Sequence, residues 1–268
     1  MTEPFGERLQ RAVAERGQLC VGIDPHLTTL QEWDLPVSVE GLEEFTRTMV
    51  TATAETVAVV KPNSAMFEVF GAAGIAVLER AIVDLRAAGA LVLLDAKRGD
   101  IGSTMQAYAQ AYLMEGAPLS VDAMTVSPFL GIGALTPAME MARENGRGLY
   151  VLCRTSNPEG GQIQQAWAGK YSIATRIAQE VQAANAGSPH GPFGLVVGAT
   201  LPELDIELDE FTGSILAPGV GPQGATIASM QALFGDKYPQ VLPTASRVVS
   251  TAGPQLGALA DAIESLRH

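Results

Sequence analysis

Charged residues of both signs gather in one six-residue run, Asp95-Ala-Lys97-Arg98-Gly-Asp100. The run follows the apolar block Leu-Val-Leu-Leu, so Asp95 and Lys97 lie where a buried strand is expected to end. Residues two apart on an extended chain point to the same side, so both charges should face inward. Burying charges is costly unless they pair. A lysine held among carboxylates stays protonated and becomes a positioned proton donor.

Asp100 has two interpretations. It stands at the expected start of a helix, where it could be only the N-cap, with Thr104 as a polar residue of the first turn. Capping does not explain Asp95 and Lys97, which directly follow an apolar block. Arg98 is expected to be a surface or salt-bridging residue rather than a catalyst.

Further polar residues follow other apolar segments. Each one alone is better explained as a solvated loop residue or part of a turn, and a snorkelling surface lysine is an even alternative for Lys61. In a barrel of alternating strands and helices, however, the carboxyl ends of the strands converge on one mouth, where catalytic groups lie. Together these residues favour a site at that mouth. They are Asp24, Lys61, Ser127, Ser156, Ser246 and Arg247.

A glycine-rich segment, Ala217-Pro-Gly-Val-Gly-Pro-Gln223-Gly224, precedes a stretch with helical spacing. Glycines let backbone N–H groups approach an anion closely, although an ordinary turn explains such a segment about as well. Arg247 follows the next expected strand, and an arginine can bind phosphate oxygens through two parallel hydrogen bonds. Loops after the seventh and eighth strands form the frequent phosphate site of such barrels.

The elements that must position these residues are short apolar runs separated by amphipathic segments. Continuous apolar blocks such as Leu-Val-Leu-Leu are typical of strands buried on both faces. Eight strands alternating with helices predict one (β/α)8 barrel domain over residues 1–268, with a doubly wound open sheet as the alternative. The expected strands are Leu19–Asp24, Thr56–Lys61, Leu91–Ala96, Asp122–Val126, Leu149–Arg154, Gly194–Gly198, Ser214–Ala217 and Val241–Ala245.

Three expected helices stand out. Gly74–Ala88 carries an apolar face of Ile75, Leu78, Ile82 and Leu85, and Ala166–Ala186 carries one of Ile173, Ile177 and Val181. An additional helix over Glu3–Gly17 should precede the first strand.

Composition narrows the class of protein. The chain of 268 residues is 47% hydrophobic with a net charge of −12, which disfavours nucleic-acid polymers and anionic membranes as partners. A small anionic substrate stays compatible, because a few local cations can overrule the global charge. Cys20 and Cys153 lie in apolar runs, as expected of buried residues in a reducing cytoplasm. The start of the chain does not read as a secretory signal, and no apolar stretch reaches membrane-spanning length. The three histidines are scattered, so neither a metal cluster nor a serine–histidine nucleophile is expected.

The sequence resembles the orotidine 5′-phosphate decarboxylases, in particular the longer bacterial subgroup sometimes called type 2. The segment Asp95-Ala-Lys97-Arg98-Gly-Asp100-Ile101 is the specific part of this resemblance. Supporting motifs span nearly the whole chain in the right order: Gly22-Ile-Asp24-Pro, Lys61-Pro-Asn, Thr125-Val-Ser-Pro-Phe-Leu-Gly, Arg154-Thr-Ser156-Asn-Pro, Ala217-Pro-Gly-Val-Gly-Pro-Gln223-Gly and Ser246-Arg247.

The resemblance implies a (β/α)8 barrel, a homodimer with shared active sites, and conversion of orotidine 5′-phosphate to uridine 5′-phosphate and CO2 without metal or organic cofactor. By resemblance, Lys97 is the proton donor to pyrimidine C6 and Asp95 a flanking carboxylate. Asp100, Ile101 and Thr104 are expected from the partner subunit. Asp24 and Lys61 would contact the ribose and the charge network, and Ser156, or alternatively Ser127, the pyrimidine edge. The phosphate would meet Gln223, Gly224, Ser246 and Arg247.

Two loops are expected to close over the substrate, the stretch after Gly219 and the segment Asn157–Gln165. Three rival functions stay open. A magnesium-dependent sugar-phosphate enzyme with the same core would want an acidic residue at position 93, where this chain has Leu93. An aldolase would use Lys97 as a Schiff base. A nucleotide-binding module would bind uridine monophosphate without chemistry.

Overall fold

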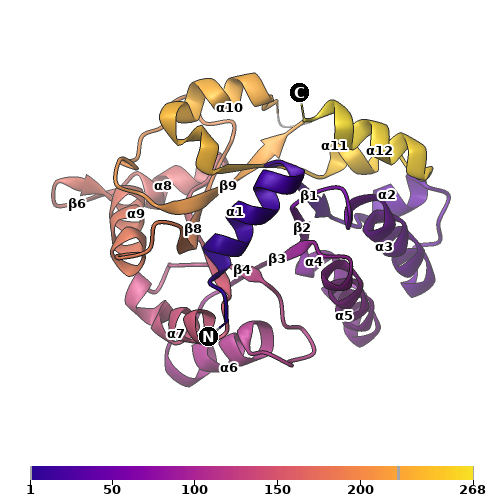
Figure 1. Cartoon of the computed structure of the whole chain (residues 1–268), viewed down its shortest axis with the longest axis horizontal. Helices are drawn as coiled ribbons and strands as arrows, with labels where there is room; N and C mark the ends of the chain where they lie inside the picture. Colours follow the sequence, from indigo (N-terminus) through magenta and orange to yellow (C-terminus); the bar gives the residue numbers. More distant parts are fainter. Residues whose placement is uncertain (1, 222–223, 268) are drawn as a thin grey trace.

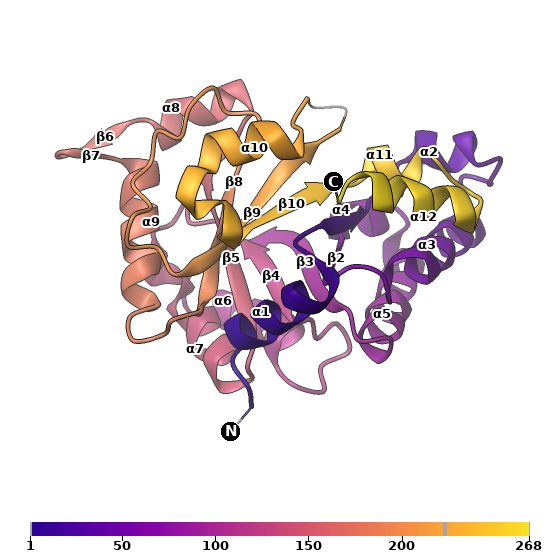
Figure 2. The same cartoon turned by 45° about the horizontal axis from the view of Figure 1, so that its top comes forward.

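The computed structural model describes residues 2–221 and 224–267, and its central feature is one parallel sheet. The strands are β1 (Cys20–Ile23), β2 (Val59–Pro62), β3 (Leu91–Arg98), β4 (Ala123–Val126), β5 (Gly148–Arg154), β8 (Gly191–Val197), β9 (Gly213–Val220) and β10 (Val241–Ala245). They close into a barrel in the order β1-β10-β9-β8-β5-β4-β3-β2 (Figure 1 and Figure 2). The predicted (β/α)8 barrel is therefore confirmed, and the alternative of an open sheet is wrong. All eight expected strands form, with ends that differ by up to three residues.

Helices surround this barrel (Figure 2). They are α1 (Phe5–Arg16), α2 (Leu27–Glu32), α3 (Val39–Thr53), α4 (Ser64–Glu68), α5 (Gly71–Ala87), α6 (Gly102–Leu113), α7 (Thr136–Glu144), α8 (Gly161–Gln164), α9 (Ile173–Ala184), α10 (Ile227–Phe234), α11 (Arg247–Ser250) and α12 (Leu256–Ser265). Short 3₁₀ turns occupy Ile132–Leu135, Pro158–Gly160 and Gly235–Gln240. None of the described helices is long and apolar enough to cross a membrane.

The two long helices expected from periodicity form, one of them shorter than predicted. In α5 the predicted inner face is buried at Leu78, Ile82 and Leu85. The segment predicted to be helical from Ala166 begins instead with a small antiparallel hairpin, β6 (Trp167–Ala168) and β7 (Tyr171–Ser172). Gly169 at its turn has a φ of +72°, and the Ser172 side chain caps α9 by accepting from the Thr175 N–H. The helical prediction over residues 166–172 was therefore wrong, because a left-handed glycine and an N-cap start the helix later.

The expected N-terminal helix is confirmed as α1, which lies across the barrel (Figure 1). Its Phe5 packs edge-on against the Tyr150 ring inside the barrel, with centroids 6.2 Å apart. A Cβ on Gly148 would lie 2.3 Å from a Phe5 ring carbon, so the start of β5 accepts only glycine under this helix. Phe5 and Leu9 join a cluster of inward-facing strand residues that includes Leu91, Leu93 and Leu216. This cluster fills the barrel from the end that α1 covers.

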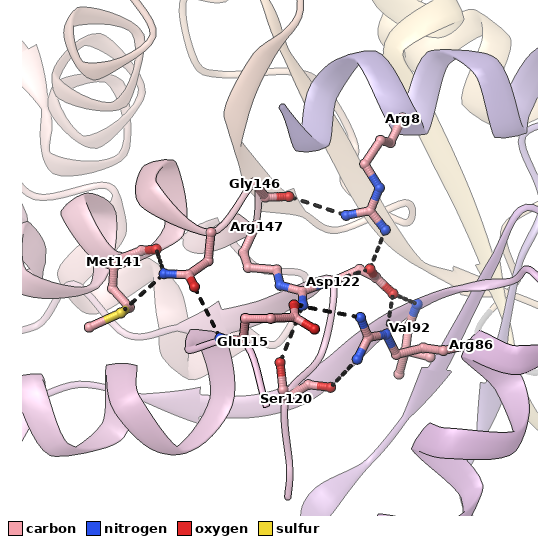
Figure 3. A network of polar contacts seen from close by, with 10 residues as sticks. Arg8, Arg86, Val92, Glu115, Ser120, Asp122, Met141, Gly146 and Arg147 are labelled. Atoms are coloured by element: carbon pink, nitrogen blue, oxygen red, sulfur yellow. Dashed lines mark hydrogen bonds and ion pairs between the residues drawn. The ribbon is translucent and has the colours of Figure 1, made fainter. Parts of the chain in front are cut away.

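A group of ion pairs fastens α1 to the amino-terminal ends of the strands (Figure 3). At its centre is Asp122, the residue before β4, which is 1% exposed. Its carboxylate accepts hydrogen bonds from Arg8 of α1, from Arg147 Nη1 at 3.0 Å and from the Val92 N–H at 2.9 Å. Arg86 Nε lies 3.9 Å away. We call Asp122 and these three arginines the Asp122 cluster.

Candidate active site

The inward-facing positions of the strands change from apolar to polar toward the carboxyl ends. Successive inward positions are two residues apart. On β2 the apolar Val59 is followed by Lys61, on β3 Leu93 is followed by Asp95, and on β4 Ala123 is followed by Thr125. The site is therefore the last layer of the barrel interior, at the end opposite α1. A layer of this kind lies at the mouth that barrel enzymes use for chemistry.

Two lysines in this layer, Lys61 and Lys97, form ion pairs with the carboxylate of Asp95. Lys61 Nζ lies 3.2 Å from Asp95 Oδ2, and Lys97 Nζ lies 2.6 Å from Asp95 Oδ1. The side chains of Lys61 and Asp95 are only 6% and 13% exposed, whereas that of Lys97 is 51% exposed. The charged chain, as we call Lys61, Asp95 and Lys97, therefore runs from the buried wall to the open mouth.

The ionised forms of the two buried groups are strongly favoured. Burial alone would lower the pKa of Lys61, but the carboxylates of Asp24 and Asp95 outweigh it and raise that pKa above its usual range. Burial alone would raise the pKa of Asp95, but Lys61, Lys97 and the Thr125 hydroxyl hold it well below its usual range. Both groups are therefore charged at neutral pH, as a fixed electrostatic device requires.

The approach of Lys97 to Asp95 does not come from a regular strand. β3 pairs with β4 at Leu94 opposite Met124, and the next pair is Arg98 opposite Val126, so β3 bulges across Asp95–Lys97. Lys97 has a φ of +48°, a left-handed conformation that is rare outside glycine. The prediction that Asp95 and Lys97 lie side by side is confirmed, but the reason given for it, plain strand alternation, is wrong.

Thr125 is a site residue to which the sequence motifs gave no role. Its hydroxyl donates to Asp95 Oδ1 at 2.9 Å and accepts from the backbone N–H groups of Ala96 and Lys97 at 3.0 and 2.9 Å. The signal that could have revealed it is its position two residues after inward-facing Ala123, level with Lys61 and Asp95.

Two buried polar atoms at the mouth have no hydrogen-bond partner within the described residues, Asp24 Oδ1 and Ser246 Oγ. They are neighbours, because a Cβ built on Gly22 would lie 3.1 Å from Ser246 Oγ and 3.3 Å from Asp24 Oδ2. Buried polar groups nearly always have partners. Beside the charged chain, Asp24 Oδ1 can accept a hydrogen bond from a hydroxyl group of a ligand, and Ser246 Oγ can donate one.

A cavity of about 300 Å³ opens above the charged chain. Asp95, Lys97 and Thr125 line one side, and Ser156 lines another. Ser156 fits there because Gly198 has no side chain: a Cβ at Gly198 would lie 2.8 Å from that of Ser156. Ser127 lines a neighbouring apolar cavity instead, and its N–H donates to the Arg98 carbonyl.

The expected phosphate loops lie side by side, because a Cβ on Gly221 would be 2.7 Å from that of Val248, the residue after Arg247. Arg247 is exposed at the start of α11. Gly224 has a φ of +96°, a conformation that favours glycine, and its N–H donates to the Gly221 carbonyl. Gln223 lies outside the described residues.

Asp100 does not cap the following helix, so that interpretation is wrong. α6 begins at Gly102 with Ile101 at the N-cap position, and Asp100 Oδ1 accepts from the Ile101 N–H at 2.8 Å. Among the ion pairs of residues 2–221 and 224–267, none joins Asp100 to Lys97. Ile101 and Thr104 are exposed. Arg98 forms the expected salt bridge, at 2.5 Å to Glu68.

The segment Asn157–Gln165 is fastened at both ends: Asn157 Oδ1 accepts from the Thr155 hydroxyl at 2.6 Å, and Gln164 and Gln165 hold the other end. The Gln164 side chain accepts from the Thr155 N–H at 2.9 Å, and Gln165 Nε2 donates to Asp205 at 2.7 Å. Asp205 also accepts from Arg154 Nε at 2.9 Å. These contacts hold Thr155 and Asn157, the residues on either side of Ser156, and sequence motifs did not reveal the part of Asp205.

The two cysteines are buried and unpaired, as predicted. Burial raises the pKa of each thiol to about 12, so neither is a ready nucleophile. Within the described part of the chain, no group of three or more His, Cys, Asp or Glu side chains could hold a metal ion.

The chain is similar in sequence to known proteins over nearly its whole length. A Streptomyces coelicolor orotidine 5′-phosphate decarboxylase is 54% identical over 264 residues, covering 98% of this chain and 95% of that protein. One from Salinispora arenicola is 55% identical over 259 residues, covering 96% and 93%.

Solved structures agree. A crystal structure from Streptomyces avermitilis that carries the same assignment is 53% identical, with a TM-score of 0.96, and covers 99% of this chain and 94% of that one. Leishmania donovani OMP decarboxylase is 30% identical, with a TM-score of 0.76, over 98% and 99% of the two chains. Residues 17–258 match OMPdecase, the orotidine 5′-phosphate decarboxylase / HUMPS family. The chain therefore belongs to that family.

Proposed function

We propose that Lys97 delivers the proton in the reaction that this chain catalyses, the decarboxylation of orotidine 5′-phosphate to uridine 5′-phosphate and CO2. The activity follows from relatives at 54% identity over nearly the whole chain. The observation that carries the role of Lys97 is its 2.6 Å contact with Asp95 on the open side of the charged chain.

The chemistry needs a cation at the carbon that loses CO2. When the bond from pyrimidine C6 to the carboxylate breaks, its electron pair stays on C6, and no adjacent group of the substrate delocalises it. The ammonium of Lys97 stabilises this developing charge and then donates one proton to C6. Solvent returns a proton to Lys97 after the product leaves. Asp95, held ionised by Lys61, keeps the ammonium in place.

The remaining mouth residues are proposed as substrate contacts. Ser156, which shares the cavity with Asp95 and Lys97, would meet the pyrimidine edge in preference to Ser127. Asp24 and Lys61 would contact the ribose, since Asp24 Oδ1 is buried without a described partner. The phosphate would lie against Gln223, Gly224, Ser246 and Arg247. Its binding, remote from the reacting bond, would hold the closing loops and orient the pyrimidine.

We propose a homodimer with shared active sites. Around the mouth, Ile101, Phe129 and Leu130 expose large apolar side chains, with 62%, 76% and 53% of their surfaces accessible. Neighbouring apolar side chains of this kind mark interaction surfaces. A partner on this face would bring its Asp100 carboxylate to Lys97, with Ile101 and Thr104 contacting the same substrate.

Subunit mixing tests the shared site. Random exchange between Asp100→Ala and Lys97→Ala dimers makes half of the dimers mixed, each with one intact site of two. About a quarter of wild-type activity should return. If mixtures stay inactive, Asp100 serves its own chain.

Each rival function requires a residue or predicts a result that differs from those of the proposed decarboxylase. The acidic residue that a magnesium-dependent relative needs would stand at Leu93, which is 1% exposed and belongs to the apolar barrel core. A Schiff-base aldolase predicts that borohydride traps a carbonyl substrate on Lys97. We further propose that the enzyme works in the reducing cytoplasm, which suits its two unpaired cysteines.

One assay tests the function. The purified, EDTA-treated protein is incubated with orotidine 5′-phosphate while the orotate absorbance is followed. Its steady loss at an undiminished rate is expected. Turnover that appears only after Mg²⁺ is added, or binding of uridine 5′-phosphate without turnover, would contradict the proposal.

A further inference from the structure

The Thr125 hydroxyl uses every hydrogen-bonding position it has. A hydroxyl offers one donor and two acceptor sites. Both acceptor sites are taken by the N–H groups of Ala96 and Lys97, at 3.0 and 2.9 Å. Since backbone N–H groups can only donate, the hydroxyl proton is directed to Asp95 Oδ1, at 2.9 Å. The orientation of this hydroxyl is therefore fixed by the backbone on one side and by the carboxylate on the other.

These bonds stand at the irregular part of β3. In a regular parallel ladder the strand N–H groups would pair with carbonyls of the neighbouring strand. The bulge between Leu94 and Arg98 removes that pairing, and the Thr125 hydroxyl replaces it for both N–H groups. Thr125 is 1% exposed, so water cannot easily take its place. The left-handed Lys97 is thus held by a side chain of the adjacent strand.

The same oxygen of Asp95 meets both Thr125 and Lys97. Oδ1 accepts from Thr125 Oγ1 at 2.9 Å and from Lys97 Nζ at 2.6 Å, while Oδ2 meets Lys61 at 3.2 Å. Thr125 therefore fixes the backbone from which the Lys97 side chain starts and the carboxylate on which its ammonium ends.

We propose that Thr125 is a positioning residue, which sets the direction of the Lys97 ammonium toward the substrate through the β3 bulge and Asp95. This inference rests on the proposed role of Lys97 in decarboxylation. Thr125 itself need not touch the reacting atoms. Its loss should harm the chemical step more than binding, because phosphate and ribose contacts lie on other strands.

The test compares Thr125→Val with Thr125→Ser. Valine keeps the shape and the strand preference of threonine but removes the hydroxyl. Losing a hydrogen bond to a charged group should lower kcat about ten- to a hundredfold, with KM and the Kd of uridine 5′-phosphate changed less than about threefold. Thr125→Ser, which retains the hydroxyl, should restore most of kcat.

Thr53→Val is the matched control. Thr53 is fully buried in α3, and its hydroxyl donates to the Met49 carbonyl at 2.7 Å, far from the mouth. Both valine variants should lower the thermal midpoint, but only Thr125→Val should lower kcat. Should Thr125→Val not fold, Thr125→Cys replaces it, with a smaller fall in kcat expected because a thiol is a weaker donor and acceptor.

Three results would overturn the proposal. They are a kcat within about twofold of wild type in the valine (or cysteine) variant, a rise in KM that accounts for the whole loss, and a serine variant as slow as the valine variant. Wild-type protein that does not turn over orotidine 5′-phosphate would refute the proposed function instead, which keeps the two failures apart.

Discussion

The Asp122 cluster and the charged chain are two versions of one arrangement at opposite ends of the barrel. Each has a carboxylate between cations, and the two carboxylates belong to the neighbouring segments β3 and β4. Asp122 is held by arginines and by a backbone N–H, and is 1% exposed (Figure 3). Asp95 is held by two lysines and a hydroxyl, and its outer partner Lys97 is 51% exposed.

The difference lies in the room that each region leaves for a ligand. In the Asp122 cluster the carboxylate is saturated by groups from α1, β3 and the residue before β5, and although Arg147 Nε has no partner among the described residues, these bonds serve to hold the elements together. At the mouth, Asp24 Oδ1 and Ser246 Oγ have no described partner, and a cavity of about 300 Å³ opens beside Lys97. A charge cluster thus becomes a candidate active site when one of its members is an exposed proton donor and a cavity beside that donor can hold a ligand.

The largest expected effect separates the two regions by activity. Lys97→Ala removes the proton donor and the cation at C6, so kcat should fall by at least about a thousandfold. Binding of uridine 5′-phosphate should stay measurable, and the urea midpoint should hardly move, because Lys97 is half exposed. Single-turnover assays and equilibrium binding check this. Near-normal turnover would show that Lys97 is not the proton donor. It would also contradict the view that the mouth is catalytic and the Asp122 end is structural.

The next effect is expected in stability alone. Asp122→Asn leaves Arg147, which is 2% exposed, without its buried counter-charge. Breaking a buried pair on one side costs about 3–5 kcal/mol of unfolding free energy. The urea midpoint should fall accordingly, while kcat of the folded variant stays within about threefold of wild type.

Glu3→Gln is the control for Asp122→Asn, since it breaks the exposed pair with Arg11 on the same helix and should change the midpoint little. An unchanged midpoint in Asp122→Asn would show that the cluster does not fasten α1. A fall in kcat as large as that of Lys97→Ala would show that the two ends are not separate in function.

Sequence patterns predicted most residues of the candidate active site but did not predict the Asp122 cluster. Apolar blocks located all eight strands, and charges at their ends located Lys61, Asp95 and Lys97, because charged residues follow several strands whose carboxyl ends meet at one mouth. The bulge at Lys97 was not predictable, since a left-handed non-glycine residue has no local signal. Thr125 and Asp122 were missed because their roles depend on which strands become neighbours after the barrel closes. The hairpin at Trp167–Ser172 was missed because the predicted helix ran through Gly169 and Ser172, which form the turn of the hairpin and the N-cap of α9.

The smallest expected effect tests whether the charged chain also stabilises the fold. The pKa of Asp95 is lowered in the native state, so its ionised form contributes stability above the unfolded value of about 4. That contribution should be lost as the pH falls below 4 toward the native pKa. Urea midpoints of wild type and Asp95→Asn should therefore differ by a constant amount between pH 7 and pH 5, and the difference should narrow progressively as the pH is lowered below 4. A gap that widens on acidification would mean that the lysines do not hold Asp95 ionised. The mouth would then lack the fixed charge that separates it from an ordinary polar loop, and Lys97 would have no anchor from which to deliver its proton.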